Sequence, residues 1–89
     1  ESFEDVVARV AGAMGRITAE HAGRDIVAVV HGGTIRAALS VALGIEAERV
    51  LGFSVDTCSV TRLDHLGHGT EGAAWRIVAV NQHPNSLTR

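Results

Sequence analysis

Apolar positions in the first part of the chain follow a helical period. Ser2 and Asp5 have the spacing of a capping box, with Asp in place of the usual Glu or Gln. Apolar residues then recur every three or four positions, at Phe3, Val6, Val7, Val10, Met14 and Ile17. This stripe predicts an amphipathic helix that begins after Ser2 and ends near 21–23.

An unbroken apolar run, 26–30, follows the predicted helix. It is rich in β-branched residues, which is typical of a strand buried on both faces in a parallel sheet. From Thr34 to Leu43 the apolar positions return to a helical period, and Gly44 stands where a C-terminal cap is expected. The pattern therefore predicts a strand, a tight turn at 31–33 and a second helix.

The remaining pattern predicts a C-terminal antiparallel hairpin. In order, the expected elements are a connector or helical turn (46–50), an extended segment (52–63), a hairpin loop (64–72), a returning strand (75–80) and an irregular tail (81–89). These strands supply too little sheet to cover both helices, and the strand at 26–30 needs a neighbour on each side. We therefore expect further strands from a segment upstream of Glu1.

Composition narrows the class of protein. The 89 residues suffice for one small domain or part of one. All basic residues are arginines, they form no cluster, and the formal net charge is -2, which disfavours a nucleic-acid partner. No apolar run has the length of a membrane span. With Cys58 as the single cysteine, expected to be buried, we predict a soluble, cytoplasmic protein with no membrane partner.

His31 lies at the carboxyl end of the predicted strand, where open α/β sheets bind ligands. Gly32 and Gly33 leave the turn without side chains, so an anion can approach the backbone N–H groups and the positive end of the next helix. A donating imidazole would complete a phosphate pocket. The alternative is that the glycines only form a tight turn and that His31 is a surface residue.

Three segments resemble the histidine phosphatase superfamily, the phosphoglycerate-mutase-like phosphatases. VVHGGTIRAAL (29–39) resembles the motif of the second active-site histidine, and Glu1 to Val6 resembles the family's Glu-Ser helix opening. The segments 57–61 and 75–77, with Asn81, resemble its closing hairpin. The resemblance implies a three-layer α/β/α fold with a mainly parallel sheet and a C-terminal antiparallel hairpin. Residues 1–89 would be the C-terminal portion of one such domain.

The resemblance also implies a mechanism with two histidines. A first histidine, in an Arg-His-Gly motif, becomes phosphohistidine, whereas His31 matches the second one, which stabilises the phosphoryl oxygens together with the amides of Gly32 and Gly33. This sequence has no Arg-His-Gly, nor the family's upstream acid. We expect the parent protein to hydrolyse a small phosphomonoester without metal or organic cofactor. The isolated chain is expected to be inactive, and the missing N-terminal half or a partner chain would supply the nucleophile.

Two alternatives stay open: phosphoryl transfer of the phosphoglycerate mutase type, and a non-catalytic module that binds phosphate or a partner. An α/β-hydrolase oxyanion hole could also use His-Gly-Gly, but it needs a G-x-S-x-G motif that this sequence lacks.

Further residues are candidates for the pocket rim. Arg36, one helical turn past the glycines, could contact phosphate or anchor the helix through a carboxylate. Thr57, like Ser59, could reach phosphate or pack at a strand edge. Glu1 could order the pocket through an arginine of the missing half or simply precede the helix cap. We interpret Asp56 as a turn residue.

A histidine cluster near the predicted loop raises the possibility of a metal site. It comprises Asp64, His65, His68 and His83. Zinc needs three or four ligands on rigid elements, which a glycine-rich loop does not provide, so we predict no metal.

Overall fold

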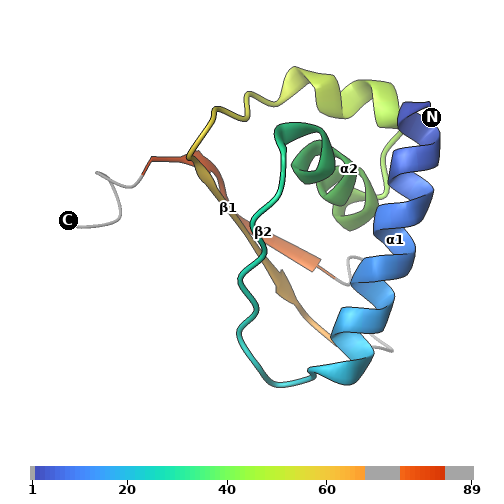
Figure 1. The fold of residues 1–89 in the computed structure, drawn as a ribbon, viewed down its shortest axis with the longest axis vertical. Coiled ribbons are helices and arrows are strands. Elements are labelled where there is room, and N and C mark those ends of the chain that lie inside the picture. The colour runs from blue at the N-terminus through green and yellow to red at the C-terminus, as the bar shows by residue number, and fades with distance from the viewer. Residues whose placement is uncertain (1, 68–74, 84–89) are drawn as a thin grey trace.

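Two packed helices beside a β-hairpin form the fold (Figure 1). The computed structural model describes residues 2–67 and 75–83. Its elements are α1 (Phe3–Glu20), α2 (Gly32–Leu43), the 3₁₀ helix η1 (Ala47–Gly52), β1 (Val60–His65) and β2 (Trp75–Gln82). Helix α2 contacts α1, η1 and β2, so it is the element around which the others pack.

The start of α1 is fixed by the predicted capping box. Ser2 Oγ accepts a hydrogen bond from the Asp5 N–H at 3.1 Å, and Asp5 Oδ2 accepts one from the Ser2 N–H at 3.0 Å. The helix ends at Glu20 with His21 as its C-cap, as the pattern predicted. Its one buried residue among those described is Val10, which lies on the apolar stripe.

We expect Ser2→Ala to lower the free energy of unfolding by about 1 kcal/mol, because the Asp5 N–H at the start of α1 loses its acceptor, Ser2 Oγ. Urea denaturation followed by circular dichroism measures the change. Ser2→Thr keeps the hydroxyl and serves as the control. Equal stabilities of the alanine and threonine variants would contradict this role for the cap.

Helix α2 supplies most of the buried core. It begins at Gly32, two residues before the predicted start, and ends at the predicted Gly44 cap, whose φ of 66° is left-handed and whose N–H bonds to Ser40 O. Ala37, Leu39, Ser40 and Ala42 are its buried residues. Leu39 and Val50 of η1 are both 0% exposed and form the centre of the core with Val10.

The predicted buried strand at 26–30 is not formed. These residues connect α1 to α2 as an extended loop, outside the sheet (Figure 1). Val27 is 91% exposed and Val29 is 97% exposed. The apolar pattern indicates a preference for burial, but a strand also needs a neighbouring backbone to hydrogen-bond with. None of the described residues pairs with this segment.

The predicted hairpin is confirmed, with shifted boundaries. Strands β1 and β2 pair antiparallel and form the one sheet in the described part of the chain. The segment expected to be extended from residue 52 instead contains the end of η1 and a turn at 57–58, so β1 begins at Val60. The mixed α/β class is thereby supported, and the one sheet among the described residues is the expected antiparallel hairpin. The three-layer arrangement with a mainly parallel sheet stays a prediction. Most of the predicted loop and tail lie outside the described residues.

No helix within residues 2–67 and 75–83 combines the length and the apolar character that a bilayer span requires.

Candidate active site

A pocket of about 140 Å³ lies between the start of α2 and the loop that precedes β1. One wall comes from α2 and the residues just before it, and the other from the loop. Its lining residues are Val30, His31, Gly32, Ile35, Val55, Asp56, Thr57, Cys58 and Ser59. The pocket thus brings together His31, Gly32 and Thr57, three of the residues singled out in the sequence.

His31 is the N-cap of α2. Its carbonyl oxygen accepts hydrogen bonds from the N–H groups of Thr34 at 3.0 Å and Ile35 at 3.2 Å. No side chain caps this helix end, and the N–H groups of Gly32 and Gly33 precede the first residue that has an intrahelical acceptor. The helix dipole adds a partial positive charge at the same point. This wall of the pocket is therefore suited to an anion.

Neither glycine at the start of α2 is required by local packing. A Cβ added to Gly33 would meet no heavy atom within 4 Å, and one added to Gly32 would make ordinary contacts with Val55 at 3.6 and 3.7 Å. Both residues have helical backbone conformations that other residues adopt freely. What glycine provides here is open access to the backbone amides, the property that an anion site needs.

Arg36 anchors α2 to the end of η1. Its Nε donates a hydrogen bond to the Phe53 carbonyl oxygen at 3.2 Å, and it is not among the residues that line the pocket. The structure supports the predicted role of Arg36 as a helix anchor and not its role as a phosphate contact. The acceptor is a backbone carbonyl, whereas a carboxylate was expected. Glu1 lies outside the described residues.

The second wall is a turn, Asp56 to Ser59. The Asp56 carbonyl oxygen accepts hydrogen bonds from the Ser59 N–H at 3.2 Å and from Ser59 Oγ at 2.8 Å. Asp56 is thus a turn residue, as predicted. The prediction of a buried Cys58 is wrong, because this residue is exposed and takes a left-handed conformation, with φ 64°, at the pocket surface.

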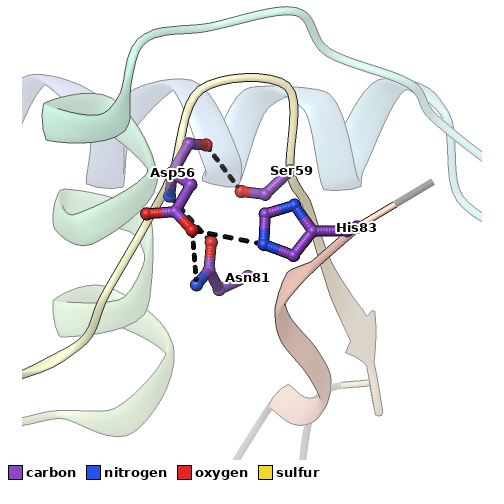
Figure 2. A network of polar contacts seen from close by, with 4 residues as sticks. All are labelled: Asp56, Ser59, Asn81 and His83. Carbon is purple, nitrogen blue, oxygen red and sulfur yellow. Dashed lines mark hydrogen bonds and ion pairs between the residues drawn. The ribbon is translucent and has the colours of Figure 1, made fainter. Parts of the chain in front are cut away.

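Residues from the end of β2 hold this turn, a role that the sequence patterns did not predict (Figure 2). Asn81 Oδ1 accepts a hydrogen bond from the Asp56 N–H at 2.7 Å, and Asn81 Nδ2 donates to Asp56 Oδ2 at 3.3 Å. His83 Nε2 lies 3.2 Å from the same Oδ2. We call Asp56, Ser59, Asn81 and His83 the Asp56 network. Its contacts depend on the hairpin register, which local sequence patterns do not specify.

Two of the histidines weighed as metal ligands, His65 and His83, lie at opposite ends of the hairpin. His65 packs edge-on against Trp75, with ring centroids 4.7 Å apart, whereas His83 belongs to the Asp56 network. His68 lies outside the described residues. Within the described ranges, no three His, Cys, Asp or Glu side chains gather in a way that could hold a metal ion.

Comparison with known families finds a family-model match over most of the chain. The family model of the histidine phosphatase superfamily (branch 1) matches residues 1–82, a range that contains His31, the glycines and both strands. No curated protein and no solved structure matches the chain. Superfamily membership indicates phosphoryl-transfer chemistry, in keeping with a helix N-terminus open to an anion. Because the match covers nearly the whole sequence, the chain belongs to the histidine phosphatase superfamily.

Proposed function

We propose that residues 1–89 form the phosphate-holding part of an enzyme that hydrolyses small phosphomonoesters through a phosphohistidine. The observation that carries this proposal is the pocket in which His31 lies at the open N-terminus of α2, opposite the turn at Thr57. Family membership supports the reaction class.

The pocket offers donors suited to a phosphoryl group in transfer. Negative charge spreads over its equatorial oxygens as the bonds to the attacking and leaving groups change. The His31 imidazole and the Gly32 amide at the pocket, with the next amide of the helix, that of Gly33, are the donors that would stabilise this charge. The two amides are held by the helix before the reaction begins. The Thr57 hydroxyl would serve at the rim.

The nucleophilic histidine comes from outside residues 1–89 in this proposal, from the preceding segment of the same domain or from a partner chain. The extended loop at 26–30 is where the strand that carries it would pair. Its β-branched side chains are exposed, and its backbone groups make no sheet hydrogen bonds with the described residues. Pairing there would bring the carboxyl end of a parallel strand next to His31 and build toward a three-layer α/β/α fold.

A second candidate function is a phosphate-binding module without catalysis. It is favoured by the absence of an Arg-His-Gly motif from the 89-residue sequence. Mutase-type transfer would use the same pocket and nucleophile but would return the phosphoryl group to a second hydroxyl. Binding and turnover therefore have to be measured separately.

Titration of the ¹⁵N-labelled chain with inorganic phosphate tests the pocket. We expect the amide signals of Gly32 and Gly33 to shift, and we expect His31→Ala to weaken binding about tenfold, because a charge-assisted hydrogen bond is lost. The matched control is His21→Ala, since His21 is an exposed histidine at the far end of α1. Equal affinities of the two variants, or shifts spread evenly over the chain, would refute a phosphate site here.

A further inference from the structure

A bulge in β2 places Asn81 where it can reach the pocket wall. Val60 pairs with Gln82 and Arg62 with Ala79, so the single Thr61 faces two residues, Val80 and Asn81. Asn81 has a φ of 56°, in the left-handed region that asparagine tolerates better than most residues. An extra residue of this kind bends a strand and changes the direction of its side chains.

The side chain of Asn81 meets Asp56 with both of its polar atoms. The amide oxygen accepts the Asp56 N–H at 2.7 Å and the amide nitrogen donates to the carboxylate at 3.3 Å. This pair of bonds spans 25 positions in the sequence and joins the end of the hairpin to the turn at 56–59 (Figure 2). The backbone bond fixes where the turn begins, and the side-chain bond fixes the direction of the carboxylate.

The direction of that carboxylate matters because Asp56 lines the pocket. A carboxylate free to turn toward a bound phosphate would repel it. Asn81 Nδ2 and His83 Nε2 both lie against the same oxygen, Asp56 Oδ2, at 3.3 and 3.2 Å. Two nitrogens on one carboxylate oxygen hold its negative charge on the side of β2.

We infer that Asn81 is a positioning residue for the phosphate pocket: it holds the turn at 56–59 against α2 and keeps the Asp56 carboxylate on the β2 side. The inference rests on the proposed function as far as phosphate is concerned. Its effect on the turn is independent of any ligand. Asn81 itself does not line the pocket, so it acts through Asp56.

Three variants of the 89-residue chain isolate this role. Asn81→Gly permits the left-handed backbone but removes the side chain. Asn81→Asp places a second carboxylate against Asp56. The exchange Asp56→Asn with Asn81→Asp restores one donor and one acceptor in reversed positions. Gln82→Glu is the matched control for added charge, because it introduces the same charge one residue away, outside the Asp56 network.

Two readouts are measured: hydrogen exchange and chemical shifts of the amides at 56–59, and the Kd for inorganic phosphate. We expect Asn81→Gly to speed exchange of the Asp56 amide about tenfold and to weaken phosphate binding about fivefold, as the loss of two hydrogen bonds predicts. Phosphate binding by the Asn81→Asp variant is expected to be weaker still. The exchanged pair should return both readouts to within about twofold of the wild type, and Gln82→Glu should leave both unchanged.

Turn amides and a phosphate Kd that stay at wild-type values in Asn81→Gly would overturn the inference. The inference would also be overturned if the double variant, Asp56→Asn with Asn81→Asp, showed the same amide exchange and the same phosphate Kd as Asn81→Asp alone. A wild-type chain that binds no phosphate would refute the proposed function instead. In that case the turn amides alone decide whether Asn81 positions the turn.

Discussion

Replacing His31 with alanine is expected to abolish the phosphatase activity that we propose arises when the 89-residue chain is combined with an upstream segment that carries an Arg-His-Gly motif. Loss of one preorganised donor to the transferring group costs on the order of 100-fold to 1,000-fold in rate. The chain alone is expected to release no phosphate from p-nitrophenyl phosphate, because in the proposed mechanism the nucleophilic histidine lies outside residues 1–89.

Four reactions make this measurement decisive: the chain alone, the upstream segment alone, their mixture, and the mixture with His31→Ala. His21→Ala, remote from the pocket, should leave the rate of the mixture unchanged. Phosphate release by the chain alone, lost on His31→Ala, would contradict the two-part mechanism. Phosphate binding without turnover in the mixture would favour the non-catalytic module.

The largest expected effect on stability comes from Leu39→Ala. Leu39 is 0% exposed on the buried face of α2, between the elements that α2 contacts, so its truncation leaves a cavity. Such changes cost roughly 2–5 kcal/mol, which approaches the whole free energy of unfolding of a small domain. We expect the variant to be largely unfolded, or to unfold at a much lower urea concentration than the wild type.

Leu51→Ala is the matched control for Leu39→Ala. Leu51 lies in η1 and is 63% exposed, so the same truncation there should change the free energy of unfolding by less than about 0.5 kcal/mol. Urea denaturation monitored by circular dichroism compares the two. Similar losses in both variants would mean that the core does not centre on α2.

Elements whose causes are local could be predicted from the sequence. The Ser2 and Asp5 bonds at the start of α1 join residues three positions apart, and Gly44 ends α2 because a left-handed residue is needed there. The hairpin followed from two runs of strand-forming residues. In the two helix ends the deciding contact lies within a few residues of the pattern that predicted it, and in the hairpin the two pairing strands are neighbours along the chain.

Features that depend on distant partners were missed or mistaken. The apolar run at 26–30 indicates burial, yet a strand forms only where another backbone pairs with it. The site residues also fall into a local group and a group that depends on distant partners. His31 and the glycines form a local motif that the sequence displays directly, and His31 lines the pocket. Asn81 meets Asp56 only because a bulge shifts the register of β2, and no periodicity in the sequence encodes that shift.

The extended loop at 26–30 has a consequence for the behaviour of the chain in solution. An exposed stretch of β-branched residues whose backbone forms no sheet hydrogen bonds with the described residues is a template on which identical chains can stack edge to edge. Arg24 and Asp25 place charges directly before it, the arrangement by which charged residues next to apolar strands oppose aggregation. A strand that covers this edge would therefore protect the chain from self-association as well as complete its sheet.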